Sequence, residues 1–287
     1  MANGLRFHVA ECGEGERLAL CLHGFPELWL SWRHQIPLLA ELGYRVWAPD
    51  LRGYGETERP SRTRDYDLDL LLGDVAGLID AAGCRETLLV GHDWGGIIAW
   101  LFANERLRTL DRLVVMNCPH PAVAIRSGGL RQLLRSWYMF FFQLPRLPEW
   151  ALRAGRGRRL VEMFRHSVNR PDVFPPEVLR AYQEAVIRPG AAKAMIDYYR
   201  MLFRGPGSRR MRRAEPRMID TPTLLLWGEA DFALGKQTTF GTERYVPELS
   251  VRYLPGVSHW VQQEARETVN SMLEAWLCDQ PVPEAGS

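Results

Sequence analysis

The fold of this chain is indicated most clearly by Leu88-Leu89-Val90-Gly91-His92-Asp93-Trp94-Gly95-Gly96. It reads as a short apolar strand, a turn, and the start of a helix that runs from Trp94 to about residue 104. Glycines on both sides of the turn, Gly91 and Gly95, permit a sharp and strained bend that lifts Asp93 above a sheet. Gly96 lets the helix pack closely on the strand. The stretch therefore predicts an exposed Asp93 as a candidate nucleophile.

Strands and helices alternate on both sides of this turn. Short apolar runs predict strands at 18–22, 44–48, 87–90, 113–116, 223–227 and 250–254. Helical spacing predicts helices at 31–42, 68–82, 94–104 and 264–277. Continuously apolar strands separated by helices are typical of a mostly parallel sheet with helices on both faces, so we expect an α/β fold.

The middle of the chain follows a different pattern. From about Pro119 to Pro216, helical stretches alternate with proline breaks and no convincing strand occurs. Because a structureless loop of this length is implausible, we expect a helical subdomain inserted into the sheet domain. The expected division is a core domain of residues 1–118 and 217–287 and a helical cap of residues 119–216. The many arginines of the cap are expected to be solvated, although an acidic partner stays open.

Composition narrows the classes of function. A net charge of +2 and a charged fraction of 24% favour neither nucleic acid nor a membrane surface as a partner. No apolar run reaches the roughly 18 residues of a membrane span, and the first residues do not resemble a secretory signal. The five cysteines lack metal-ligand and C-x-x-C spacing, so we expect buried free thiols, a cytoplasmic protein and no metal site.

The residue type at the turn decides the chemistry. A serine there that attacked an sp³ carbon would form an ether, which water does not readily cleave. The carboxylate of Asp93 would form an ester instead, so it suits alkyl transfer followed by ester hydrolysis. The alternative interpretation is that Asp93 only caps the following helix, since aspartate is a preferred N-cap residue. The flanking glycines would then have no purpose.

The segment after the strand at 18–22 is expected to complete the nucleophile's surroundings. It contains His23-Gly24-Phe25-Pro26. In a fold with this type of turn, the backbone N–H groups of Phe25 and Trp94 form an oxyanion hole, since Pro26 has no N–H. Taken alone, His23-Gly24 is explained about equally well as a turn that ends a strand.

A histidine and an acid complete the set. His259 follows the last predicted strand and Asp231 follows the strand before it, so the chain order is nucleophile, acid, histidine. With a near-neutral pKa, His259 can take a proton from water while Asp231 orients its ring. Glu229 is a rival acid two residues earlier. The other histidines are expected at surface or packing positions, with His92 as a candidate neighbour of the site.

These segments resemble the soluble and microbial epoxide hydrolases of the α/β-hydrolase superfamily. The resemblance covers nearly the whole chain, and the stretches that carry it are His23 to Glu27, Ser31-Trp32-Arg33, Gly43 to Val46, Asp50 to Gly55, Gly91 to Gly96, Gly228 to Phe232 and Gly256 to Trp260. It implies an α/β-hydrolase fold with an inserted cap. It also implies that Asp93, Asp231 and His259 form the catalytic triad, which favours Asp231 over its rival.

Members of this family resemble one another in two cap tyrosines that hold the epoxide oxygen. The matching positions are Tyr138 and Tyr199, the latter preferred over Tyr198. A neutral phenol, with a pKa of about 10, stays a donor at pH 7 and can protonate the alkoxide of ring opening. Helical spacing gives Tyr138 a common face with Leu134, Phe141 and Phe142. The alternative interpretation is that these tyrosines are core aromatics.

The resemblance implies an epoxide hydrolase that uses no cofactor and acts on a small apolar epoxide with water. A hydroxyalkyl ester on Asp93 would be hydrolysed by His259 and Asp231 to release a vicinal diol. A haloalkane or haloacid dehalogenase shares the triad, but Phe25 stands where a halide-binding asparagine often occurs. A ligand-binding sensor on the same fold is the third hypothesis, although it has little need of a water-activating pair. A homodimer stays open.

Overall fold

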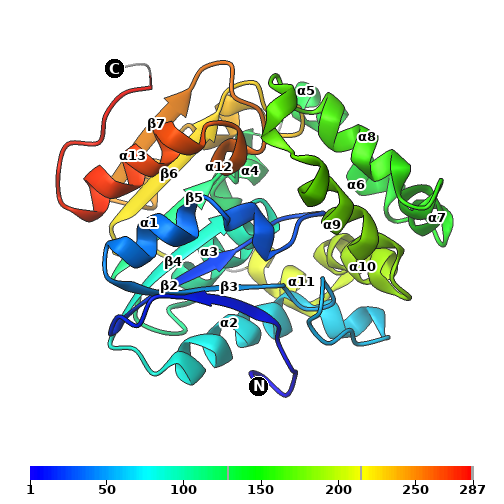
Figure 1. Cartoon of the computed structure of the whole chain (residues 1–287), viewed down its shortest axis with the longest axis horizontal. Coiled ribbons are helices and arrows are strands. Elements are labelled where there is room, and N and C mark those ends of the chain that lie inside the picture. Colours follow the sequence, from blue (N-terminus) through cyan, green and yellow to red (C-terminus); the bar gives the residue numbers. More distant parts are fainter. Residues whose placement is uncertain (128, 214, 286–287) are drawn as a thin grey trace.

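The computed structural model describes residues 1–127, 129–213 and 215–285, whose arrangement is shown in Figure 1. Its centre is a seven-stranded sheet with the order β1-β3-β2-β4-β5-β6-β7. The strands are β1 (Val9–Cys12), β2 (Arg17–Leu22), β3 (Tyr44–Pro49), β4 (Glu86–His92), β5 (Arg112–Met116), β6 (Thr223–Gly228) and β7 (Leu249–Leu254). Within these residues β1 alone pairs antiparallel with its neighbour, so the mostly parallel sheet is confirmed.

Helices cover both faces of the sheet. The helices outside the segment between β5 and β6 are α1 (Gln35–Glu41), α2 (Leu68–Ala82), α3 (Trp94–Glu105), α12 (Val261–Glu264) and α13 (Arg266–Leu277). α2 and α3 belong to the core on one face, where Leu20 of β2 is buried, and α1 and α13 to the core on the other, where Cys21 is buried. Because successive strand residues point to opposite faces, a continuously apolar strand serves both cores.

The described residues between β5 and β6 form helices and no strand, as their sequence pattern predicted. These inserted helices are α4 (Pro121–Ser127), α5 (Leu130–Arg135), α6 (Trp137–Phe141), α7 (Leu147–Arg153), α8 (Arg158–His166), α9 (Pro176–Ile187), α10 (Ala191–Arg204) and α11 (Pro206–Arg213). Figure 1 shows α5 to α10 grouped at one side of the molecule, opposite α13 and the C-terminal end.

Local signals explain why α2 has the bounds that the sequence predicted. The side chain of Asp67 caps the helix by accepting a hydrogen bond from the backbone N–H of Asp69. Gly83 ends it in the left-handed conformation, with a φ of 64° that costs glycine little. The helix buries one side against the sheet.

Three elements differ from the prediction. The helix predicted at 31–42 is divided into a 3-10 helix (Trp29–Trp32) and α1, in which Pro37 sits in the first turn, where a missing N–H costs no helical hydrogen bond. The helix predicted at 264–277 begins slightly later, at Arg266 of α13, and the short helix α12 precedes it. β1 was not predicted, because an antiparallel edge strand of four residues has little periodicity to detect.

Cysteine burial agrees only in part with the expectation of buried free thiols. All five cysteines are free; Cys21 and Cys118 are buried, Cys12 and Cys84 are half-buried, and Cys278 is exposed. No helix in the described part of the chain combines the length and the apolar character needed to cross a membrane.

Candidate active site

Asp93 lies at a strained turn between β4 and α3. Its backbone has a φ of 50° and a ψ of −115°, a conformation that non-glycine residues rarely adopt. A Cβ added to Gly91 would lie 2.3 Å from the carbonyl oxygen of Gly95, and one added to Gly95 would lie 2.0 Å from that of Leu22. Both flanking glycines are therefore required by close backbone contacts, and the turn presents Asp93 at the carboxyl edge of the sheet.

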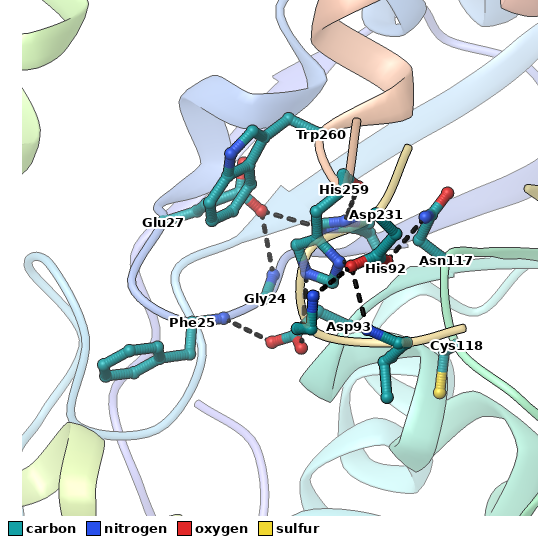
Figure 2. A network of polar contacts seen from close by, with 12 residues as sticks. Gly24, Phe25, Glu27, His92, Asp93, Asn117, Cys118, Asp231, His259 and Trp260 are labelled. Atoms are coloured by element: carbon teal, nitrogen blue, oxygen red, sulfur yellow. Dashed lines mark hydrogen bonds and ion pairs between the residues drawn. The ribbon is translucent and has the colours of Figure 1, made fainter. Parts of the chain in front are cut away.

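The loop after β2 closes over the Asp93 carboxylate. The backbone N–H of Phe25 donates a hydrogen bond to Asp93 Oδ1 at 2.8 Å (Figure 2). Gly24 permits this approach, because a Cβ there would lie 2.5 Å from the Asp93 Cβ. The N–H of Trp94 lies in the first turn of α3, where helical N–H groups lack intrahelical partners and favour negative charge.

His23 positions this loop through two hydrogen bonds. Its Nε2 accepts a hydrogen bond from the backbone N–H of Leu51 at 3.0 Å, and its Nδ1 donates to the carbonyl oxygen of Gly24 at 2.9 Å. Burial lowers the pKa of His23, so the ring stays neutral and can make both bonds. His23 therefore positions the loop that carries the Phe25 N–H, so His23-Gly24 does more than end the strand.

His259 lies between two carboxylates. Its Nδ1 is 2.7 Å from Asp231 Oδ2, and its Nε2 is 3.5 Å from Asp93 Oδ2 (Figure 2). The rival acid Glu229 instead pairs with Lys236, and both side chains are part-exposed. The structure thus brings together the three residues that the sequence grouped as nucleophile, acid and histidine.

Asn117 fixes the orientation of Asp231, and the sequence analysis missed it. Its amide nitrogen donates to Asp231 Oδ2 at 2.7 Å, and its amide oxygen accepts from the backbone N–H of Gly228 at 2.8 Å. The other carboxylate oxygen of Asp231 accepts from the N–H groups of Ala233 and Leu234. A polar residue directly after β5, at the edge where the other site residues follow their strands, was the signal available in the sequence.

A buried hydrogen bond between His92 and Glu27 supports the backbone of the histidine loop. His92 Nδ1 lies 2.8 Å from Glu27 Oε2, and His92 Nε2 lies 2.9 Å from the carbonyl oxygen of His259. Both side chains are fully buried. His92 is therefore a neighbour of the site, as the sequence suggested, whereas the part played by Glu27 was not predicted.

Two carboxylates set the protonation of His259. Burial disfavours the imidazolium, but the charges and hydrogen bonds of Asp231 and Asp93 outweigh burial and raise the pKa of His259 to about 10. Burial also opposes ionisation of Asp93, yet its pairing with His259 holds the pKa of Asp93 below the usual value. The near-neutral pKa expected for His259 is therefore wrong for this resting arrangement, because carboxylates flank the ring on both sides.

Two tyrosines of the inserted helices lie together in the cavity that Asp93 lines. The ring centroids of Tyr138 (α6) and Tyr199 (α10) are 5.9 Å apart, and both rings line this cavity. Burial and the negative charge of Asp93 raise the pKa of both phenols, so they stay protonated at neutral pH. The neighbouring Tyr198 instead donates its hydroxyl to the carbonyl oxygen of Arg52 at 2.8 Å.

The face predicted for Tyr138 is only partly present. Phe142 is buried against Tyr199, with ring centroids 4.9 Å apart. Leu134 is exposed, because the predicted helix is broken at Ser136, between the end of α5 and the start of α6. The break displaces Leu134 from the face that carries Tyr138.

The cavity has a volume of about 650 Å³ and is mostly apolar. Besides Asp93 and the two tyrosines, its wall includes Ile97, Trp100, Leu101, Met139, Leu202 and Leu234. This volume suits a small organic molecule whose surface is held largely by apolar side chains. In the described part of the chain, no group of three or more His, Cys, Asp or Glu side chains is arranged to hold a metal ion.

Comparison with known proteins places the chain in a family. The sequence model of the alpha/beta hydrolase family matches residues 19–271. The chain is 38% identical to epoxide hydrolase 4 of Mus musculus, over 96% of its own length and 77% of that protein. It is 37% identical to the AB hydrolase superfamily protein YfhM of Bacillus subtilis, over 97% and 96% of the two chains. The protein thus belongs to the alpha/beta hydrolase family and, within it, to the epoxide hydrolases.

Solved structures lead to the same family. The epoxide hydrolase of Bacillus megaterium, in complex with an inhibitor, superposes with a TM-score of 0.87 at 31% identity and covers 97% of this chain and 99% of its own. An epoxide hydrolase from Vigna radiata superposes with a TM-score of 0.83 at 30% identity, over 97% and 96% of the two chains. The predicted fold class and family resemblance are confirmed.

Proposed function

We propose that this protein hydrolyses small apolar epoxides to vicinal diols through a covalent ester on Asp93. The observation that carries the proposal is the joint presence in one apolar cavity of a carboxylate at a nucleophile turn and two protonated phenols. A carboxylate alone suits several alkyl transfers, whereas paired phenols suit a reaction that generates an alkoxide.

In the first step, Asp93 attacks a ring carbon of the epoxide. Oδ2 is the attacking oxygen, since Oδ1 is held by the Phe25 N–H as the future carbonyl oxygen of the ester. The carbon–oxygen bond of the ring breaks, and its electron pair goes to the ring oxygen. Tyr138 and Tyr199 donate hydrogen bonds to that oxygen, and one of them gives up its proton to form the alcohol.

Ester formation changes the charge state of His259. The esterified Asp93 no longer carries the negative charge that helps to raise the pKa of His259, so this pKa falls. The imidazolium releases its proton, and this release balances the return of a proton to the tyrosinate. Alkylation of Asp93 thereby converts His259 from a protonated partner into a base.

In the second step, neutral His259 takes a proton from water, and the resulting hydroxide attacks the ester carbonyl carbon. The tetrahedral intermediate carries its negative charge on Oδ1, where the N–H groups of Phe25 and Trp94 stabilise it. When the intermediate collapses, the ester C–O bond breaks and the departing alkoxide takes the proton of the new Asp93 carboxyl group. The diol then leaves an ionised Asp93 and a protonated His259. Asp231, held by Asn117, keeps the imidazole oriented throughout.

The helical segment of residues 119–216 is proposed to act as the cap of the site, on a core of residues 1–118 and 217–287. It contributes Tyr138 and Tyr199, while the core contributes the nucleophile, the acid and the histidine. A cap that carries the proton donors ties ring opening to closure of the cavity around an epoxide, and it limits the access of bulk water to the ester.

The decisive experiment traps the ester. In a His259→Gln variant, the ester forms but is hydrolysed slowly, so incubation with an aryl epoxide should add the full epoxide mass to a peptide that contains Asp93. Intact mass spectrometry and peptide mapping would detect the adduct. An Asp93→Asn/His259→Gln variant is the matched control and should stay unmodified. If only a haloalkane formed an adduct, and that adduct lacked the halogen, the proposed activity would change from epoxide hydrolysis to dehalogenation.

A further inference from the structure

The outer surface of α5, α6 and α7 concentrates exposed apolar side chains. Each of the following exposes between 45% and 67% of its surface: Leu133, Leu134, Trp137, Phe140, Leu144, Leu147 and Trp150. We call these seven residues the apolar stripe. Leu133 and Leu134 lie on α5, Trp137 and Phe140 on α6, and Leu147 and Trp150 on α7, while Leu144 lies between α6 and α7. Clustered exposed apolar residues mark interaction sites in folded proteins.

The segment that carries the apolar stripe is rich in arginines without neutralising partners among the described residues. Eight lie between residues 131 and 165: Arg131, Arg135, Arg146, Arg153, Arg156, Arg158, Arg159 and Arg165. The same interval contains two acidic residues, Glu149 and Glu162, and Glu149 pairs with Arg200. Within the described ranges, none of the eight arginines forms an ion pair, unlike Arg108, which pairs with Asp80. This face therefore carries a local positive charge that the net charge of +2 conceals.

An open hollow next to the apolar stripe gathers part of this charge. It has a volume of about 770 Å³, and its wall includes Arg146, Arg153, Arg156 and Trp150. Arg159 lies over the ring of Trp150, 5.3 Å from its centroid. Guanidinium groups around a hollow offer the planar, multiple hydrogen-bond donors that phosphate groups bind.

We propose that this face docks on the surface of an anionic lipid bilayer. The apolar stripe would enter the boundary between headgroups and acyl chains, and the arginines would contact the phosphates. Exposed tryptophan, phenylalanine and leucine beside unpaired arginines is the composition of helices that lie in a bilayer interface. Figure 1 shows α5, α6, α7 and α8 at the edge of the molecule opposite α13.

A second copy of this chain fits the same face less well. In a twofold-symmetric dimer the same patch meets itself, so the unpaired arginines of one copy would face those of the other. Like charges brought together in this way oppose association, whereas an anionic surface neutralises them. The charge pattern therefore distinguishes the lipid surface from a dimer, which the apolar residues alone do not.

Docking also bears on the entry of substrate. Met139 and Phe203 line the substrate cavity, and Phe203 packs against Phe140 of the apolar stripe with ring centroids 5.7 Å apart. α6 thus has the cavity on one side and the proposed bilayer contact on the other. Delivery of an apolar epoxide from the bilayer rests on the proposed function, whereas docking itself does not require turnover.

Sedimentation of the full chain with lipid vesicles tests the proposal. We expect binding to vesicles of phosphatidylcholine mixed with phosphatidylglycerol, weaker binding to phosphatidylcholine alone, and loss of binding at high salt. Trp137→Ser/Phe140→Ser should weaken binding at least about tenfold. Arg153→Gln/Arg158→Gln should weaken it about fivefold for each arginine.

Matched controls remove the same chemistry elsewhere. Phe240→Ser replaces an aromatic ring that is 58% exposed outside the inserted helices, and Arg209→Gln/Arg213→Gln removes two exposed charges from α11. Both should bind vesicles like the parent. Equal loss of binding in these controls, or a parent that binds no vesicles, would overturn the proposal. The proposal would also be overturned if the parent formed a dimer without binding vesicles and the Trp137→Ser/Phe140→Ser variant did not form this dimer.

Turnover separates this proposal from the proposed function. Without vesicles, the Trp137→Ser/Phe140→Ser variant should hydrolyse a water-soluble epoxide at the parent rate, since neither residue lines the cavity. If the protein bound vesicles but hydrolysed no epoxide, the proposed docking surface would be supported and only the proposed epoxide hydrolysis would be rejected.

Discussion

The edge of the sheet and the inserted helices contribute to one cavity by different means. Asp93, Asp231 and His259 each follow a strand of the parallel sheet, after β4, β6 and β7 respectively. Parallel strands end at the same edge, so residues just beyond them converge however far apart they are in sequence. Tyr138 and Tyr199 have no such guide, since they lie on helices whose positions depend on packing. The short sequence around each strand end is therefore enough to predict which residues meet at the sheet edge. The positions of Tyr138 and Tyr199 instead depend on how the helices pack.

The two regions also differ in how firmly each side chain is held. Asp231 accepts hydrogen bonds from Asn117 and from two backbone N–H groups, and His259 is fixed by Asp231. Tyr138 and Tyr199 are placed chiefly by aromatic contacts with each other and with Phe142. Chemistry at the edge should therefore respond to loss of single hydrogen bonds, and chemistry at the tyrosines to loss of their hydroxyls.

Removing Asp93, the proposed nucleophile, should have the largest effect. Asp93→Ala should lower diol formation by at least about 10⁴-fold, because the other cavity carboxylates, Glu105 and Glu215, are not at the turn beside His259 and the Phe25 N–H. Initial rates of diol release, measured by chromatography, would test this. The thermal unfolding midpoint should not fall, since Asp93 occupies a strained backbone position and a buried charge is removed. Retained diol formation in the folded variant would remove Asp93 from the mechanism.

Variants of the two cavity tyrosines test the contribution of the inserted helices. Tyr138→Phe and Tyr199→Phe should each lower kcat for epoxide opening by roughly 10²-fold, and the double variant should lose more, as expected for proton donors. Tyr198→Phe is the matched control, because its hydroxyl bonds to the Arg52 carbonyl instead. That control should keep its rate and lose about 1 kcal/mol in free energy of unfolding. If all three single Tyr→Phe variants lost rate equally, the hydroxyls of Tyr138 and Tyr199 would have no specific role and the tyrosines would serve only packing.

Much of the sheet edge could be predicted from the sequence, and the reasons are specific. The glycines around Asp93 and the apolar runs before Asp231 and His259 are short-range signals that fix a turn or a strand end. The break at Ser136, which exposes Leu134, has no such signal: neither glycine nor proline stands there. The sequence shows that the inserted helices are rich in arginine, but it does not show which of these arginines lack carboxylate partners.

The protonation of His259 gives a sharper test of coupling across the site. Asp93→Asn removes one of the two carboxylates that raise the pKa of His259 to about 10, so this pKa should fall by at least about one unit. Titration of the ring proton by NMR would measure it. In the parent, the stability contributed by the imidazolium is complete below the unfolded pKa of about 6.5 and is lost as the pH rises through the folded pKa. The variant should lose this stability at lower pH, and an unchanged pKa would contradict the proposed switch.

Asn117 provides the finest test, because it contacts neither the cavity nor the nucleophile directly. Asn117→Ala should leave Asp231 without one donor and the Gly228 N–H without its acceptor, so the imidazole would be oriented less well. Ester hydrolysis should slow by about tenfold while ester formation changes little, since Asp93 keeps its Phe25 contact. Single-turnover kinetics would show that the ester on Asp93 accumulates to a larger fraction before it decays. A variant slowed equally in both steps would indicate a general loss of structure, whereas a selective effect would place Asn117 among the residues that position the base.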